Sequence, residues 1–389
     1  MHLVYVTESM PNRDPMFGDG SSMIPFEVIR FLPDDVLVTL LTFPGEVDTP
    51  AEIHDRCQTV TILTGRRHEF AEAQSLVTRL HSGAAQRNTA AVRSLVRRAS
   101  ASADATLLHG PHVVPLASAT VGPAVLQTVD PWSMRTDMDR QLATGWRARF
   151  RAHKARQAER VERAIPAHVR LLTVSPRDAQ RWSERLSRPV RGIPNGVTMQ
   201  PRPTRRPGPP RICFVGSLNY GPNIDSARIL VREIGPLVWR SHPEVEIIVA
   251  GRRPAAEVLE LAGDRVRVMP NVPSVAEIFL DADVAVFPDA HGVGIRNSVG
   301  EALGCAVPVV ATAAAAREQP PHPLLTVRSD VRELVPVIDD LLRAHPPGGT
   351  QPTAIDERSW RDVAVDYLDE LQEAIAQGGP STKPRLTRG

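Results

Sequence analysis

Short β-like runs alternate with helical stretches along the whole chain, and this alternation restricts the fold more than any other feature. Apolar runs such as Val245–Ala250 are typical of strands covered on both faces. Strands separated by helices form parallel sheets, so we predict an α/β fold of doubly wound type. The expected strands lie near residues 2–8, 36–43, 59–64, 105–110, 124–130 and 169–175, and then near 211–217, 245–250, 266–269, 284–288, 307–312 and 324–327.

The chain of 389 residues is too long for one ordinary core, and two domains are expected. The clearest break is Pro201–Pro210, a proline-rich stretch that cannot continue a helix or a central strand. We predict an N-terminal domain over 1–190 and a C-terminal domain over 191–347. Residues 348–377 are expected to form a helix, and 378–389 a disordered tail. The apolar residues with helical spacing in that segment are Val363, Val365, Leu368, Leu371 and Ile375.

Composition limits the partners and the compartment. A net charge of +2 gives no reason to expect nucleic acid as a partner. Three distant cysteines (Cys57, Cys213 and Cys305) favour neither a disulfide framework nor a zinc site, and they indicate the reducing cytoplasm. The chain enters its first strand without the pattern of a signal peptide, which again favours a cytoplasmic protein. Arginine far outnumbers lysine, which suggests a bacterial source.

The segment 292–304 is rich in glycine and follows the expected strand 284–288. Glycines allow backbone N–H groups to approach a ligand closely, and the N-terminus of the following helix favours a pyrophosphate. Arg296 adds a cation and Glu301 a carboxylate that is able to bind ribose hydroxyls. This combination indicates a nucleotide-diphosphate site. The alternative is a helix that only packs on the sheet, with both charged side chains solvated.

Five segments stand in a fixed order: Val174–Ala179, Ile193–Val197, Phe214–Asp225, Val249–Arg252 and 292–304. Together they resemble retaining glycosyltransferases of the GT-B fold, of the family-4 type and nearest the exopolysaccharide-type branch. The resemblance covers nearly the whole chain. It implies two Rossmann-like domains that face each other across a cleft, a nucleotide-sugar donor in the second domain, retention at the anomeric carbon, and a C-terminal helix that crosses back to the first domain.

The chain departs from the family pattern at three positions. Val293 stands where most members carry a glutamate, and Ser298 where the exopolysaccharide branch carries a lysine. Ser217 replaces a cationic residue of the first glycine-rich loop. Cationic help for the diphosphate is therefore expected from Arg296, with Arg252 or Arg253.

The donor site is predicted from these motifs. Negative charge grows on the diphosphate as the glycosidic bond breaks, and the planar guanidinium of Arg296 suits phosphate oxygens. A surface salt bridge is the alternative for Arg296, and a helix-stabilising role is the alternative for Glu301. The predicted donor-binding residues are Gly18, Gly216, Ser217, Asn223, Arg252, Gly292, Gly294, Ile295, Asn297, Ser298 and Glu301.

The first domain is expected to hold the acceptor. His109 and Asp130 end two expected strands, and Asp19 lies between two glycines before a helix. With Arg296 they form the predicted catalytic set. A purely structural histidine and an ordinary Asx turn at Asp19 are the alternatives. The basic stretch Arg135–Arg163 is interpreted as a solvated helix face, or as a contact with anionic lipid or a phosphorylated acceptor.

The predicted function is transfer of a sugar from a nucleotide-diphosphate sugar to a small hydroxylated natural product, of antibiotic or aminocyclitol type, in secondary metabolism. The resemblance implies no metal, and no cofactor is expected beyond the co-substrate. A monomer or homodimer is expected, and contact with a membrane is not. The alternatives are a transferase for cell-surface saccharide, a catalytically silent GT-B auxiliary subunit, and an epimerase or phosphorylase on the same two-domain plan.

Overall fold

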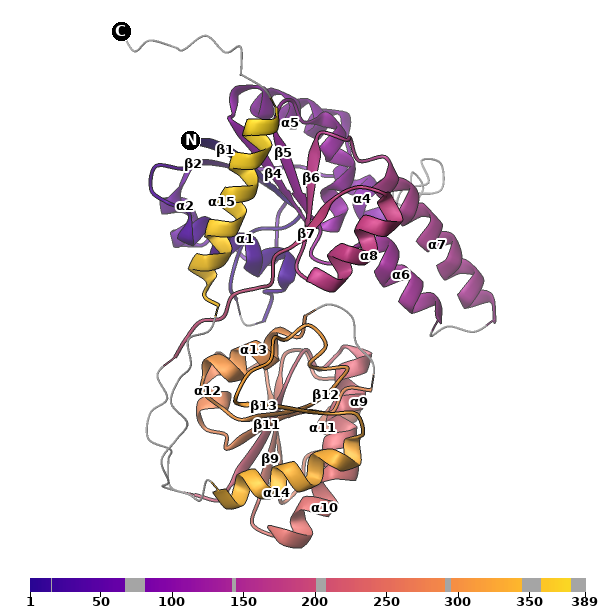
Figure 1. The fold of residues 1–389 in the computed structure, drawn as a ribbon, viewed down its shortest axis with the longest axis vertical. Coiled ribbons are helices and arrows are strands. Elements are labelled where there is room, and N and C mark those ends of the chain that lie inside the picture. Colours follow the sequence, from indigo (N-terminus) through magenta and orange to yellow (C-terminus); the bar gives the residue numbers. More distant parts are fainter. Residues whose placement is uncertain are drawn as a thin grey trace. The chain divides into compact units, whose positions relative to one another are not determined.

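The structure, a computed structural model, describes residues 1–14, 16–66, 81–141, 145–200, 208–290, 295–344 and 358–378. The chain forms two compact units (Figure 1). The first contains Met1–Arg13, Phe17–Pro194 and residues 361–378, and the second contains Asn195–Trp360 and the described residues of segment 14–16. Each unit is built on one parallel sheet, as the alternation of strands and helices predicted.

The described part of the first unit contains a seven-stranded sheet in the order β3-β2-β1-β4-β5-β6-β7. All neighbouring strands are parallel, so their carboxyl ends share one edge. Its strands are β1 (His2–Thr7), β2 (Leu37–Thr42), β3 (Cys57–Ile62), β4 (Ala105–His109), β5 (Ala124–Gln127), β6 (Val169–Thr173) and β7 (Val190–Gly192). Its helices are α1 (Gly20–Phe31), α2 (Ala51–Arg56), α4 (Ser82–Arg87), α5 (Ala90–Ser102), the 3-10 helix η1 (Pro111–Ala119), α6 (Trp132–Gln141), α7 (Gly145–Arg163), α8 (Pro176–Leu186) and α15 (Trp360–Gln377).

The second unit repeats this plan, and its described residues form a six-stranded parallel sheet in the order β10-β9-β8-β11-β12-β13. Its strands are β8 (Arg211–Val215), β9 (Glu246–Gly251), β10 (Val266–Pro270), β11 (Val284–Phe287), β12 (Val309–Thr312) and β13 (Leu325–Arg328). Its helices are α9 (Gly221–Ile229), the π-helix η2 (Leu230–Ile234), α10 (Gly235–Ser241), α11 (Ala256–Leu259), α12 (Val275–Leu280), α13 (Asn297–Gly304), the 3-10 helix η3 (Val331–Glu333) and α14 (Leu334–Ala344).

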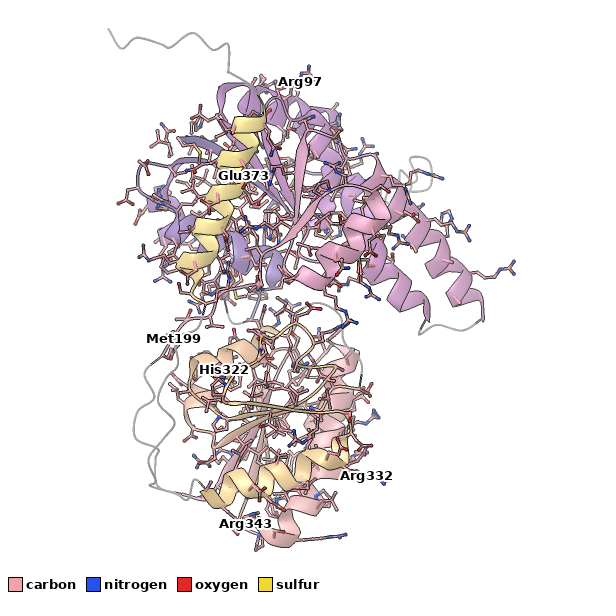
Figure 2. The ribbon with its side chains drawn as sticks, viewed as in Figure 1. Arg97, Met199, His322, Arg332, Arg343 and Glu373 are labelled. Atoms are coloured by element: carbon pink, nitrogen blue, oxygen red, sulfur yellow. The ribbon has the colours of Figure 1, made fainter. Side chains whose placement is uncertain are left out.

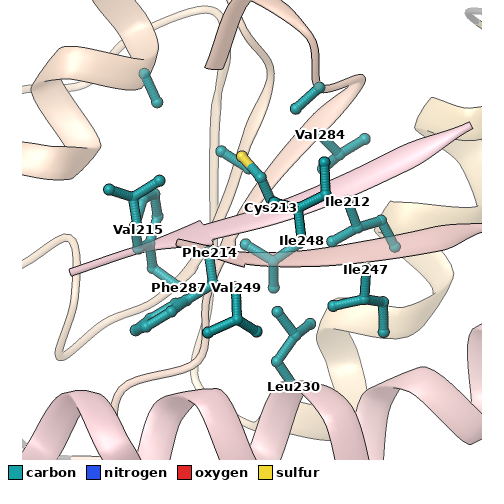
Figure 3. Packing of buried hydrophobic residues seen from close by; sticks show 14 of the residues in the cluster. Ile212, Cys213, Phe214, Val215, Leu230, Ile247, Ile248, Val249, Val284 and Phe287 are labelled. Atoms are coloured by element: carbon teal, nitrogen blue, oxygen red, sulfur yellow. The ribbon is translucent and has the colours of Figure 1, made fainter. Parts of the chain in front are cut away.

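Apolar side chains of the central strands fill the core of the second unit. Figure 3 shows Leu230 of η2 packing toward Ile247 and Val249 of β9, with Phe214 and Phe287 beside them. Burial of these residues on both faces explains why the strands read as continuous apolar runs. Charged side chains lie on the outside of both units, for example Arg97 on α5 and Arg343 on α14 (Figure 2).

Helix α15 packs on the first unit, although it follows the second unit in the chain (Figure 1). Its buried carboxylate, Glu370, pairs with Arg170 of β6 and Arg191 of β7, both at 2.8 Å. Glu373, which Figure 2 labels on this helix, is more exposed. It binds Arg170 at 2.6 Å. The apolar face differs from the prediction at one position, because Val365 is 49 % exposed. The residues that α15 does bury are Trp360, Val363, Ala364, Tyr367, Glu370, Leu371 and Ala374.

The boundaries of the units also differ from the predicted ones. The first unit continues past residue 190 to Pro194, because the short strand β7 adds to the edge of its sheet. Pro189 and Pro194 flank this strand, and a sheet edge tolerates them because their missing N–H groups break no inner ladder. The C-terminal helix covers Trp360–Gln377. The predicted helix start at residue 348 and the predicted tail beyond residue 378 lie outside the described residues.

Candidate functional site

Each sheet has one position at which the chain reverses its direction of strand addition. In the second unit this position lies between β8 and β11, because β9 and β10 extend one side and β12 and β13 the other. Ligands of open α/β sheets bind outside the carboxyl ends of the strands at such a switch point. Gly216 directly follows β8 here, and Asp289 comes two residues after β11.

Arg296 lies at this switch point and is largely buried, with only 14 % of its side chain exposed. Its Nη1 donates to a carboxylate oxygen of Asp289 and, at 3.1 Å, to Oδ1 of Asn223. The guanidinium carbon lies 5.1 Å from the ring centroid of Phe214 and 4.9 Å from that of Phe287. Burial lowers the pKa of Arg296, and the nearby carboxylate opposes this shift. The side chain is therefore a buried cation rather than the surface salt bridge considered above.

Asp289 was not among the predicted residues. Its side chain is 5 % exposed and also accepts a hydrogen bond from Oγ of Ser226 at 2.7 Å, while its carbonyl accepts one from Thr312 at 2.7 Å. A polar residue just after an apolar strand was the only signal in the sequence that pointed to it. Asp289 thus positions Arg296 and links β11 to α9 and β12.

Several other predicted donor residues belong to the same network. Asn223 donates from Nδ2 to the carbonyl of Ser217 at 3.0 Å, and Arg252 donates from Nε to Oγ of Ser217 at 2.8 Å. A Cβ atom on Gly216 would lie 2.9 Å from Nδ2 of Asn223 and 3.4 Å from Nη2 of Arg296. Position 216 therefore has to be glycine for the backbone to run this close to both side chains.

The remaining predicted donor residues lie on or near α13. Asn297 begins this helix, and its Oδ1 accepts a hydrogen bond from Nδ2 of Asn195 at 2.9 Å. Arg296 occupies the N-cap position but makes no capping hydrogen bond with its side chain. Ile295, Ser298 and Glu301 are half-buried. Gly292 and Gly294, together with Val293, lie outside the described residues.

The switch point of the first sheet lies between β1 and β4. Asp19, a predicted catalytic residue, forms the N-cap of α1, where its Oδ1 accepts from the N–H groups of Ser21 and Ser22 at 2.9 and 3.2 Å. Gly18 precedes it and is half-buried. Asp130 follows Val129, whose φ of 60° is unusual for a β-branched residue. The structure gives Asp19 a capping role, and its catalytic role stays a prediction.

His109 ends β4, as predicted, but its side chain is fully buried. Its Nε2 lies 3.3 Å from the carbonyl oxygen of Gly20, and its ring packs edge-on against Tyr5. Burial lowers the pKa of His109 to about 4, against the opposing effects of Glu8 and the Gly20 carbonyl. The neutral ring thus supports the first turn of α1, and its proposed role near the reacting sugar stays a prediction.

The buried histidine leads to a pH prediction. The pKa of His109 is lower in the folded protein than the usual 6.5, so the unfolded chain binds more protons between pH 6.5 and about 4. The contribution of His109 to the free energy of unfolding is therefore complete above pH 6.5. It falls by about 3 kcal/mol as the pH decreases from 6.5 to about 4. The free energy of unfolding of His109→Gln should fall less than that of the wild type between pH 7 and pH 4. Parallel curves would contradict a neutral buried imidazole.

A second cluster at this edge escaped the sequence analysis. Glu8 follows β1 directly, is 5 % exposed, and accepts hydrogen bonds from the N–H group and Nδ1 of His112 at 2.7 and 3.0 Å. Burial raises the pKa of Glu8, but the bonds from His112 and Ser21 outweigh burial and bring it down to about 2. The sequence analysis missed this pair because Glu8 and His112 are far apart in the chain and form no recognisable motif.

Two further findings concern the described residues only. They contain no group of three or more His, Cys, Asp or Glu side chains placed to hold a metal ion. Across the same ranges, every helix is too short or too polar to cross a bilayer.

Comparison with known proteins shows what this chain is similar to. Residues 209–344 match the family described as Glycosyl transferases group 1. The Anabaena protein HepE, solved with UDP and glucose, is 14 % identical and has a TM-score of 0.55, over 97 % of this chain and 98 % of that one. WaaG, a glycosyltransferase involved in lipopolysaccharide biosynthesis, is 13 % identical with a TM-score of 0.57, over 97 % and 100 %. A search of curated proteins found no match.

A third similar structure is an α,α-trehalose-phosphate synthase (UDP-forming) from Burkholderia xenovorans, in complex with glucose-6-phosphate. It is 11 % identical and has a TM-score of 0.56, over 96 % of both chains. These structures confirm the predicted GT-B fold of two Rossmann-like units. The family match in the second unit confirms the prediction of a glycosyltransferase.

Proposed function

We propose that this glycosyltransferase moves a sugar from a UDP-sugar to a hydroxyl of a small polyhydroxylated acceptor, with retention and without a metal. The UDP class is supported by HepE, solved with UDP and with UDP-glucose, and by the UDP-forming trehalose-phosphate synthase. A natural product of antibiotic or aminocyclitol type remains our proposal for the acceptor. A cell-surface saccharide is the alternative, and the involvement of WaaG in lipopolysaccharide biosynthesis does not decide between them.

The observation that carries the proposal is the network of Gly216, Asn223 and Arg296 beside the N-terminus of α13. With no side chain at Gly216, the backbone after β8 runs close to Asn223 and to Nη2 of Arg296, and we infer that the diphosphate binds beside this group. Charge that develops on the leaving diphosphate would meet a preorganised cation and helix N–H groups in a site that is partly removed from water. The hydrogen bond from Nη1 to Asp289 holds the guanidinium of Arg296 in place, so this group needs little reorganisation during the reaction.

The experiment that tests the function uses one labelled sugar in UDP-, GDP- and dTDP-linked form. A thermal-shift screen should show stabilisation by the UDP-sugar, because a ligand that binds only the folded state raises the apparent stability. Incubation with an acceptor panel should then yield a new glycoside whose anomeric configuration matches that of the donor. An isomerised sugar or a sugar phosphate would instead indicate an epimerase or a phosphorylase.

Glu301 provides a specific prediction for the donor. Glu301→Gln should weaken use of the donor by roughly one to two powers of ten, because a hydrogen bond to a charged group contributes about 1.5–3 kcal/mol. The measurement is kcat/KM for the UDP-sugar at saturating acceptor. Leu303→Met, a volume-conserving change on the buried face of the same helix, is the control for general disturbance of α13. Equal values for Glu301→Gln and the wild type would remove Glu301 from donor binding.

One observation favours a second candidate, a catalytically silent GT-B subunit. Nη1 of Arg296 is already bound to Asp289 and Asn223, and in that state it does not reach outward to a phosphate. UDP-sugar binding by calorimetry, with neither transfer nor hydrolysis across the acceptor panel, would support this candidate.

A further inference from the structure

The carboxylate of Glu8 fixes the orientation of the imidazole ring of His112. The carboxylate accepts from Nδ1 of His112 at 3.0 Å, so that nitrogen carries the proton and Nε2 faces away from Glu8. Nε2 has no hydrogen-bond partner among the described residues. The side chain of His112 is 29 % exposed, whereas that of Glu8 is only 7 % exposed. A buried anion thus holds a partly exposed imidazole ring in one orientation.

Glu8 and His112 occupy space that is open only because two neighbouring residues are glycines. A Cβ atom on Gly110 would overlap the carboxyl group of Glu8, and the φ of 107° at this residue strains any other side chain. A Cβ atom on Gly83 would overlap the ring of His112 at Cδ2 and Nε2. Arg87 also donates from Nε to the carbonyl of Glu8 at 3.0 Å. Residues from β1, α4 and η1 therefore fix the position of the imidazole.

The rings of Trp132 and His81 lie beside the ring of His112. The ring of Trp132 lies 5.2 Å from that of His112 and 4.3 Å from that of His81, centroid to centroid, and Trp132 and His81 are half-buried. Nδ1 of His81 accepts from the N–H group of Gly83 at 3.2 Å, which leaves its Nε2 as a donor. Burial, then Lys154 and His112, lower the pKa of His81 to about 4, so this ring is neutral near pH 7.

We propose that His112, His81 and Trp132 form an acceptor subsite for an uncharged sugar or cyclitol ring, in which Nε2 of His112 binds a ring hydroxyl. Ligand sites of this kind combine aromatic surface with a few fixed polar groups. The indole face suits the C–H face of such a ring, and the two imidazoles offer one acceptor and one donor to neighbouring hydroxyls. Glu8 is a positioning residue. The inference rests on the proposed function, because it names the acceptor class of that reaction.

Two substitutions of one residue separate binding from structure. His112→Asn keeps an amide donor near the place of Nδ1, and therefore the bond to Glu8, but removes the atom at Nε2. His112→Gln keeps a polar atom near Nε2 and loses the bond to Glu8. Saturation-transfer NMR with methyl α-D-glucopyranoside and myo-inositol, in the presence of UDP, measures binding without turnover. We expect binding to weaken by about three- to tenfold in His112→Asn and less in His112→Gln.

A structural role alone predicts the opposite order, with His112→Asn as good as or better than His112→Gln, and that order would overturn the proposal. Trp132→Leu should abolish the NMR signal and Trp132→Phe should retain it. A wild type without signal for either probe would also overturn the subsite. UDP binding to the second unit, followed in the same samples, is independent of these changes. If the wild type binds the glucoside or the inositol but does not bind UDP, that result would instead refute the proposed donor.

Discussion

Alanine in place of Arg296 is expected to lower the rate of sugar transfer by about a hundredfold or more, because a preorganised charge at the leaving diphosphate would be lost. The same change should lower the free energy of unfolding by about 3–5 kcal/mol, since it leaves the buried carboxylate of Asp289 without its cation. The two effects have different origins, so a loss of activity in Arg296→Ala alone does not establish a catalytic role.

A double variant separates them. Arg296→Met combined with Asp289→Asn removes both charges and keeps similar volumes, and the new amide oxygen can still accept from Ser226. Replacing a buried ion pair in this way is often neutral for stability. We therefore expect urea unfolding of the double variant to resemble that of the wild type, while transfer stays reduced by about a hundredfold. A stable double variant with wild-type turnover would remove Arg296 from the mechanism.

A second large effect on stability is expected at Gly251, the last residue of β9. Its φ is 154°, and a Cβ atom there would overlap the carbonyl oxygen of Gly216 on the neighbouring loop. Gly251→Ala must therefore displace backbone rather than a flexible side chain. Since backbone strain alone costs about 1–3 kcal/mol and the overlap adds to it, we expect a loss of at least about 3 kcal/mol.

Gly263→Ala is the matched control for Gly251→Ala, because a Cβ atom at Gly263 would meet nothing within 4 Å. Thermal unfolding should show a large drop in Tm for Gly251→Ala and little change for Gly263→Ala. UDP-sugar binding should weaken in the first variant as well, since Gly216 lies beside Arg296. Equal Tm values for the two variants would show that the loops at 216 and 251 can move apart at little cost.

Most of the fold could be predicted from the sequence because each central strand is a continuous apolar run with helical sequence on either side. The strand that escaped, β7, has only three residues between two prolines and carries the charged Arg191. Its place is set by pairing with β6 and by the ion pair of Arg191 with Glu370, a residue far along the chain. Such long-range partners leave no local pattern.

The residues of the two sites also divide into those that short motifs predicted and those that depend on distant partners. The sequence placed Gly216, Asn223 and Arg296 in one donor site because glycine-rich loops and an arginine after a strand form short motifs, and the structure brings these residues together. Asp289 and Glu8 were missed because each is a single carboxylate after a strand. Their meaning depends on a partner that only the folded chain supplies.

The return of α15 to the first unit has a consequence for how the protein is made. Arg170 and Arg191 leave the ribosome long before Glu370, the carboxylate that pairs with both. During translation the second unit can therefore complete its core while the first still lacks the helix that covers part of its sheet. A nascent chain that stalls before residue 360 would therefore expose to chaperones the surface of the first unit that α15 otherwise covers.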